Sequence, residues 1–271
     1  MAKLDRLGWA AGACVSAYGR RIGIRVSRPE VLGELPARLP FGWKPSRTAE
    51  VDHLYTLILG GSGSTSGIRR FNLLYAGSQR VARALDLGKV LDVLESDLHT
   101  YVAQASRRHV FVHAGVVGWH GQAIVIPGPS LSGKTTLVAA FVRAGATYYS
   151  DEYAVLDANG RVRPYIKPLS VRPAPNLRSV KYPVEAFGGV AGAEPLPVKW
   201  VLVTQYRQAA AWRPRALSPG QAILELLART VPARRRPRAV LATLRRASAD
   251  ARTLKSARGE AEGVVRSILH G

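Results

Sequence analysis

The chain has 271 residues, of which 47% are hydrophobic, and its formal net charge at pH 7 is +21. This length and apolar content suffice for one large or two small folded domains, and they exclude a chain that is disordered throughout. The single cysteine, Cys14, excludes an internal disulfide and a cysteine-based metal cluster, so the reducing cytoplasm is the expected location.

The sequence predicts no membrane span, because no apolar run approaches the ~20 residues that a membrane helix needs. Residues 7–18 imitate the apolar part of a signal peptide. Asp5, however, lies in the flank that should be basic, and no small-residue cleavage site is clear. Secretion is therefore not expected.

Basic residues are concentrated toward the C-terminal end, most densely in Arg234-Arg235-Arg236-Pro237-Arg238. Such a tract would attract nucleic acid, anionic lipid or an acidic protein partner through counterion release and long-range steering. The alternative is a solvated basic face, since no nucleic-acid fold motif accompanies the charge.

In chain order, residues 1–84 read as a small N-terminal α+β region and residues 85–271 as a larger domain. The first region contains an expected strand and an expected hairpin, at residues 18–26 and at residues 51–59 with 68–75. Residues 85–106 follow as an amphipathic helix, which we expect to pack on the larger domain.

Residues 109–117 and 122–126 are β-rich runs joined by the turn sequence 118–121, which predicts a hairpin. The second strand leads directly into a glycine-rich loop. A hairpin in this place is unusual for a purely parallel, doubly wound protein, so we expect a mixed sheet.

The loop from Gly128 to Thr135 matches the phosphate-binding pattern of two glycines with four residues between them, then lysine and a hydroxyl residue. Glycines let backbone N–H groups curl around a phosphate, and the start of the next helix adds partial positive charge. Lys134 would neutralise the outer phosphates, and the Thr135 hydroxyl would ligate Mg²⁺. The alternative is a glycine-rich turn that opens an ordinary helix. The predicted nucleotide-binding residues are Gly128, Pro129, Ser130, Leu131, Ser132, Gly133, Lys134, Thr135 and Thr136.

After the loop helix, residues 146–150 form an expected strand that ends in Asp151 and Glu152. A phosphotransfer enzyme needs a carboxylate there, to hold Mg²⁺ or to take the proton of the acceptor. The predicted metal ligands are Thr135, Asp151 and Glu152. A turn-forming Asp151 and a solvated Glu152 are the structural alternatives.

The rest of the chain alternates strands and helices. A hairpin is expected for residues 153–157 and 161–165 because Ala158-Asn159-Gly160 is a favourable turn sequence. The later elements are strands at 198–204 and 251–256 and helices at 219–228, 240–248 and 261–269.

The stretch from His113 to Val117, the loop, and Ser150-Asp151-Glu152 together resemble the kinase domain of HPr kinase/phosphorylase and its shorter relatives, some of which belong to peptide-modification clusters. The resemblance extends from about Asp52 to the C-terminus. It implies an α/β fold related to PEP carboxykinase and an ATP-dependent kinase that phosphorylates a serine hydroxyl. It also implies that Asp151 is the proton acceptor, His113 its electrostatic partner and Glu152 a second carboxylate. HPr kinase has aspartate at the position of Glu152.

We therefore expect a kinase that uses ATP and Mg²⁺, with Asp151, His113 and Lys134 as catalytic residues. The acceptor is a hydroxyl of a protein, a peptide or a small molecule, and the resemblance suggests a homo-oligomer. Two other classes stay open. One is a nucleotide-binding regulator or scaffold without phosphate transfer, and the other is an NTPase that associates with nucleic acid through the arginine tract. His113 could equally be a core histidine bonded to backbone.

Overall fold

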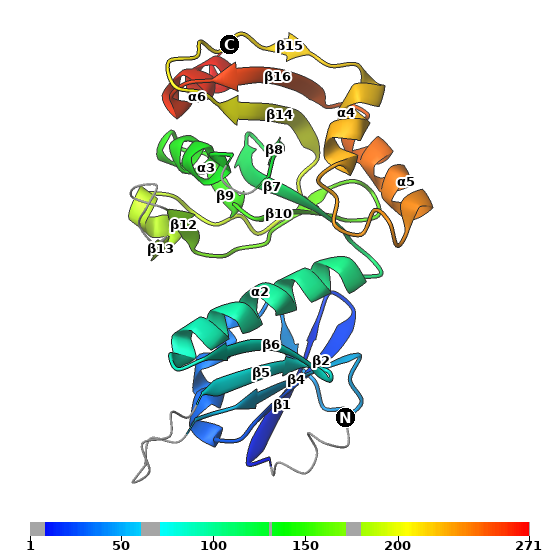
Figure 1. Ribbon diagram of the computed structural model, residues 1–271. Coiled ribbons are helices and arrows are strands. Elements are labelled where there is room, and N and C mark those ends of the chain that lie inside the picture. Colours follow the sequence, from blue (N-terminus) through cyan, green and yellow to red (C-terminus); the bar gives the residue numbers. More distant parts are fainter. Residues whose placement is uncertain (1–8, 61–70, 130–131, 172–179, 271) are drawn as a thin grey trace. The chain divides into compact units, whose positions relative to one another are not determined.

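The computed structural model describes residues 9–60, 71–129, 132–171 and 180–270. The protein is mixed α+β, and it divides into two compact units, Met1–Arg107 and Arg108–Gly271 (Figure 1). Each unit has a sheet of its own.

The first unit contains a six-stranded sheet in the order β3-β1-β2-β4-β5-β6. Neighbouring strands are antiparallel except β2 and β4, which are parallel. β1 and β2 are joined by Tyr18 and Gly19, both at positive φ, as a tight hairpin turn requires. The strands are β1 (Ala11–Ala17), β2 (Arg20–Val26), β3 (Lys44–Pro45), β4 (His53–Ile58), β5 (Asn72–Ala76) and β6 (Gln79–Ala84).

The amphipathic helix α2 (Leu87–Ala105) begins at Asp86, whose side chain accepts a hydrogen bond from the Gly88 N–H. It packs against β5 and β6 of the first sheet. These contacts assign the helix to the first unit, which extends to Arg107, whereas the sequence analysis divides the chain after residue 84 and expects the helix to pack on the larger domain. An apolar stripe shows that a helix covers a sheet, but it does not show which sheet.

The second unit contains an eight-stranded sheet in the order β11-β10-β7-β8-β14-β16-β15, with β9 paired to β7 beside this path. β7 and β8 form the expected antiparallel hairpin, while β14 is parallel to both β8 and β16. The expectation of a mixed sheet is thus confirmed. The strands are β7 (Val110–Trp119), β8 (Gln122–Pro127), β9 (Thr147–Ser150), β10 (Tyr153–Leu156), β11 (Val162–Arg163), β14 (Val198–Tyr206), β15 (Arg215–Ala216) and β16 (Arg252–Arg258).

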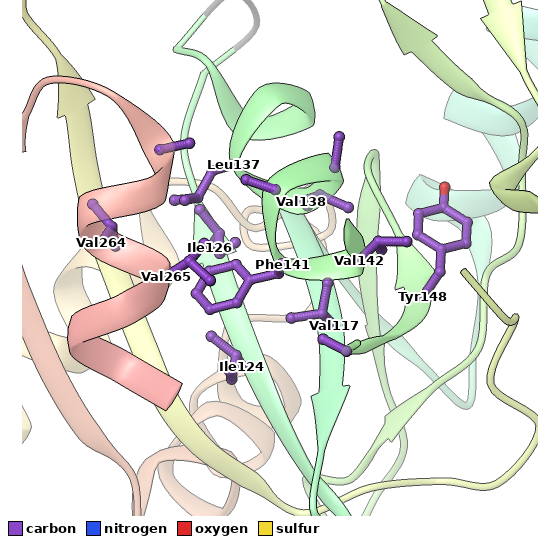
Figure 2. Packing of buried hydrophobic residues seen from close by; sticks show 14 of the residues in the cluster. Val117, Ile124, Ile126, Leu137, Val138, Phe141, Val142, Tyr148, Val264 and Val265 are labelled. Carbon is purple, nitrogen blue, oxygen red and sulfur yellow. The ribbon is translucent and has the colours of Figure 1, made fainter. Parts of the chain in front are cut away.

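Helices cover both faces of this sheet. Because successive strand residues point to opposite faces, Ile124 and Ile126 pack with one helix pair and Val125 with the other. The first pair is α3 (Lys134–Arg143) and α6 (Ala261–Leu269), and the second is α4 (Pro219–Leu227) and α5 (Pro237–Ser248). Figure 2 shows the first core, in which Phe141 of α3 lies between β8 and α6. Truncating a buried phenylalanine of this kind to alanine costs about 3–5 kcal/mol.

A short ribbon of β12 (Leu169–Val171) and β13 (Val180–Tyr182) completes the second unit, and its strand β12 lies close to α3. The remaining elements are one-turn or two-turn 3-10 helices at Pro29–Glu34, Pro36–Arg38 and Val184–Phe187. No helix in the described ranges is both long and apolar enough to cross a membrane.

Candidate functional site

The glycine-rich loop connects the end of β8 to the start of α3, as the motif requires. Gly133 precedes the helix in the left-handed conformation, with φ 83° and ψ 17°, and no side chain caps the helix. The first N–H groups of α3 therefore point out of the helix at the positive end of its dipole. Such an arrangement favours a phosphate group. Ser130 and Leu131 lie outside the described residues.

Two glycines of the loop are closely packed by other side chains. A Cβ at Gly128 would lie 2.6 Å from the Ser132 hydroxyl oxygen, and a Cβ at Gly133 would lie 2.5 Å from a nitrogen of Arg258. Neither position has room for a side chain while Ser132 and Arg258 keep these places, so glycine is required at both ends of the loop.

Lys134 lies across this loop. Its ammonium donates hydrogen bonds to the carbonyl oxygens of Gly128, at 2.9 Å, and Pro129, at 2.7 Å. Burial lowers the pKa of Lys134, while the nearby Asp151 carboxylate acts in the opposite direction. The cation is thus held over the cradle by weak backbone acceptors rather than by an ion pair, and a phosphate would be a stronger partner.

The acidic pair follows β9 at a tight turn. The Ser150 side chain accepts hydrogen bonds from the N–H groups of Glu152 and Tyr153, which bends the chain directly after the strand. This bend directs Asp151 toward α3, where the Thr135 hydroxyl donates a hydrogen bond to Asp151 Oδ2 at 3.2 Å. Two residues that the sequence assigned to one site are therefore in contact.

Asp151 is surrounded by further hydrogen-bond donors. The Tyr148 hydroxyl is 3.2 Å from Oδ1, and the Ser170 N–H donates to Oδ2 at 3.3 Å. Burial nevertheless raises the pKa of Asp151, and the charge of Glu152 adds to this; the hydrogen bonds from Ser170 and Thr135 lower it only in part. A buried carboxylate with a raised pKa is typical of a functional position.

Glu152 has a different partner. Its carboxylate forms a salt bridge with Lys167 at 2.6 Å. Within the described ranges, no group of three or more histidine, cysteine, aspartate or glutamate residues could hold a metal ion. A Mg²⁺ site at this place would therefore depend on Thr135 and Asp151, with its other ligands from phosphate and water, which is how proteins commonly bind Mg²⁺.

His113 lies on β7, directly opposite Tyr153 of β10, and the two rings are 4.7 Å apart. Its carbonyl accepts the N–H of Gly128, so this strand also supports the loop. The side chain keeps an exposed surface, but partial burial lowers its pKa, an effect that Lys134 increases and Glu152 opposes. Among the described residues, no hydrogen bond or ion pair joins His113 to Asp151, and the carboxylate that acts on its pKa is Glu152.

The sequence did not identify Tyr148, Ser170 or Arg258 as parts of this site. Arg258 is 1% exposed and donates a hydrogen bond to the Gly133 carbonyl at 2.8 Å. Tyr148 and Ser170 read as ordinary strand residues. The arginine is the last residue of an amphipathic strand, and no local pattern distinguishes it from its neighbours.

The chain matches no protein-family model, and comparison with curated proteins finds no match.

Proposed function

We propose that the second unit is an ATP-dependent kinase, similar in fold and activity to the HPr kinase and PEP carboxykinase type, that transfers the γ-phosphate to a hydroxyl group. The contact between Thr135 and Asp151 carries this proposal. It brings the hydroxyl of the phosphate-loop motif and a buried carboxylate to the same point, beside a lysine and a free helix N-terminus. Phosphoryl transfer depends on this small set of groups, because positioning and charge stabilisation supply most of the catalysis.

The residues fit a magnesium nucleotide. The loop backbone and the start of α3 would hold the phosphates, and Lys134 would exchange its carbonyl partners for phosphate oxygens. Thr135 and Asp151 would hold Mg²⁺, which neutralises charge on the phosphates when it is bound.

Phosphate transfer to a hydroxyl requires a group that accepts the hydroxyl proton. The acceptor oxygen forms a bond to the γ-phosphorus as the bond from that phosphorus to the β-γ bridging oxygen breaks, and ADP leaves with the bridging oxygen. The proton of the acceptor hydroxyl passes to the Asp151 carboxylate. When Mg²⁺ is bound nearby it favours the charged form of Asp151, so the carboxylate is ionised and able to accept that proton.

His113 and the pair of Glu152 with Lys167 would support this step without taking part in proton transfer. The salt bridge holds the acidic turn against the segment that carries Ser170. The lowered pKa keeps His113 neutral at pH 7, so it adds no charge that would compete with Lys134 for the phosphates.

The exposed arginines Arg234, Arg235 and Arg238 form a surface for an anionic partner, either an acidic protein or nucleic acid. Arg236 has a structural role instead, because it donates a hydrogen bond to the His109 carbonyl at 3.0 Å. This exposed basic surface favours the alternative function, in which the second unit binds nucleotide and regulates such a partner without transferring phosphate. The free thiol Cys14 is compatible with a reducing cytoplasm.

Incubation with γ-labelled ATP and an array of serine-containing peptides tests the kinase proposal. Transfer of label to serine peptides, and not to the same peptides with alanine in place of serine, is the expected result. Nucleotide binding without transfer to any hydroxyl would favour the regulator.

A further inference from the structure

The strand order gives the nucleotide a direction across the site. This step rests on the proposed function, since it takes the contact of Thr135 with Asp151 as the γ-phosphate end. Asp151 follows β9, which is joined to β8 through β7. β14 and β16 lie on the other side of β8. A nucleotide with its outer phosphate near Asp151 would therefore extend its nucleoside toward β14 and β16 (Figure 1).

The carboxyl ends of β14 and β16 meet the loop at this edge. Both strands run parallel to β8, and ligands of open α/β sheets bind at the carboxyl ends of such strands. Tyr206 ends β14 and is paired in register with Arg258, which ends β16. The side chain of Tyr206 adjoins the loop, because a Cβ on Gly133 would lie 3.7 Å from Tyr206 Cβ.

Tyr206 is an exposed aromatic residue, with 46% of its surface accessible. Its hydroxyl donates a hydrogen bond to Glu260 Oε1 at 3.3 Å, which orients the ring. An exposed ring next to a phosphate cradle offers a π-face to a nucleobase, and stacking of this kind accepts any base.

Arg258 fixes this ring relative to the loop. Its guanidinium lies 5.6 Å from the centre of the Tyr206 ring and donates to the carbonyls of Gly133 and Gly259, at 2.8 and 3.0 Å. Within the described ranges it has no carboxylate at salt-bridge distance, although it is fully buried. Glu260 and Glu262 attract the guanidinium only from beyond salt-bridge distance, and a buried cation without a close ion pair is costly, so packing alone does not explain why an arginine stands at this position. The buried position of Arg258 is better explained if the arginine holds the loop and the Tyr206 ring in one rigid arrangement.

From this geometry we infer that the carboxyl ends of β14 and β16 form the nucleoside site, and that the exposed face of Tyr206 stacks on the base of the bound nucleoside triphosphate. Arg258 is the positioning residue that joins this platform to the phosphate loop.

Calorimetric titration of the full chain with Mg²⁺ and either ATP or inorganic tripolyphosphate distinguishes the contribution of the base to binding from that of the phosphates. Tyr206→Ala should weaken ATP binding about tenfold, the size of a lost stacking contact, and leave tripolyphosphate binding within about twofold. Tyr206→Leu keeps a bulky side chain over Arg258 and should show the same loss, while Tyr206→Phe should bind both ligands normally. Tyr182→Ala removes a tyrosine of similar exposure, 38%, and serves as the control.

Three results would overturn the inference. Unchanged ATP affinity in Tyr206→Ala and Tyr206→Leu would show that the base lies elsewhere, and the kinase proposal would stand. An equal loss for ATP and tripolyphosphate in both variants would show that Tyr206 acts on the loop and not on a base. If the unmodified protein bound neither ligand, the proposed function itself would fail, and the nucleoside site with it.

Discussion

The Thr135 hydroxyl lies 3.2 Å from Asp151 Oδ2, although one residue belongs to the first turn of α3 and the other follows the end of β9. The core of the second unit holds α3 in place for this contact, because the helix packs on β7 and β8 through buried residues such as Leu137 and Phe141 (Figure 2). The proposed activity depends on how Thr135 and Asp151 act on a bound nucleotide.

Lys134→Ala should weaken ATP binding by at least about 1.5–3 kcal/mol, which is typical of a hydrogen bond to a charged group. The lysine has only backbone carbonyls as partners in the loop, so its removal should cost binding more than folding. Calorimetric titration with Mg²⁺ and ATP measures the change. Lys44→Ala, the same substitution at an exposed lysine of the first unit, is the control. Equal ATP affinities for the two variants would show that Lys134 does not contact the nucleotide.

Gly133→Ala should destabilise the protein and impair nucleotide binding together. The new Cβ would meet Arg258 at 2.5 Å, and the left-handed backbone alone costs a non-glycine residue about 1–2 kcal/mol. Gly220→Ala is the matched control, because Gly220 lies within α4 with open space around it and should gain up to about 1 kcal/mol. Urea denaturation of both variants checks this, and a Gly133→Ala protein as stable as the control would contradict the loop geometry.

The pKa of His113 should be below that of a solvated histidine, and Glu152→Gln should lower it further. Burial lowers this pKa, and the Glu152 carboxylate is the group that raises it. Nuclear magnetic resonance of the histidine side chain across a pH titration measures both values. A pKa that rises in Glu152→Gln would mean that another group controls the histidine.

The lowered pKa of His113 also makes the free energy of unfolding depend on pH. Between the lowered folded-state pKa of His113 and the unfolded value near 6.5, the unfolded chain binds more protons than the folded chain. The contribution of this residue is therefore fully present above pH 6.5 and is lost as pH falls through the folded-state pKa. Burial lowers the pKa values of His53 and His109 as well, so all three act in the same direction. His113→Gln should flatten this part of the stability profile in urea denaturation at pH 7.5 and 5.5, and an unchanged slope would contradict the shift.

Much of the second unit could be predicted because its signals are local. The strand before the loop, the helix after it and the closing helix at residues 261–269 follow from short periodic patterns and turn residues. The acidic turn was found for the same reason, since Asp151 stands directly after a recognisable strand.

The parts that could not be predicted depend on contacts between distant residues. Arg258 and Gly133 are 125 positions apart, and no property of either residue alone indicates that they meet. The hydrogen bond from Ser170 to Asp151 depends on how β12 folds back over α3. The packing partner of helix α2 could not be predicted for the same reason, because its apolar stripe would suit either sheet.

Replacing Arg234, Arg235 and Arg238 together with glutamine should weaken binding of a double-stranded DNA oligonucleotide and make it less sensitive to salt. Each lost phosphate contact reduces the slope of log affinity against log salt concentration by about 0.9. ATP turnover should persist, because these residues lie outside the site. Arg236→Gln should instead lower stability, since it removes the bond to the His109 carbonyl. A triple variant with unchanged DNA affinity would show that the tract is only a solvated face.

Asp151→Asn should stabilise the protein at pH 7. The pKa of Asp151 is raised in the folded state, so the folded chain binds more protons than the unfolded chain above the ordinary value of 3.8. Its ionisation thus costs stability as pH rises through that window, and asparagine removes this cost. Asparagine also fits, because its oxygen can accept from Thr135 and Ser170 while its amide donates to the Tyr148 hydroxyl, which donates in turn to the Lys167 carbonyl. Urea denaturation should show an advantage at pH 7 that shrinks toward pH 4, and a variant less stable at pH 7 would contradict the raised pKa.

The most direct test of the account is single-turnover transfer of labelled γ-phosphate to a serine peptide by the unmodified protein and by Asp151→Asn, with ATP affinity measured for both. If Asp151 is the base, the unmodified protein transfers label, and the variant transfers it about 10²–10⁴-fold more slowly. ATP affinity changes much less, because Thr135 and the phosphates carry most of the Mg²⁺ binding. Undiminished transfer by the folded variant at saturating ATP, or no transfer by the unmodified protein to any hydroxyl acceptor, would contradict the account.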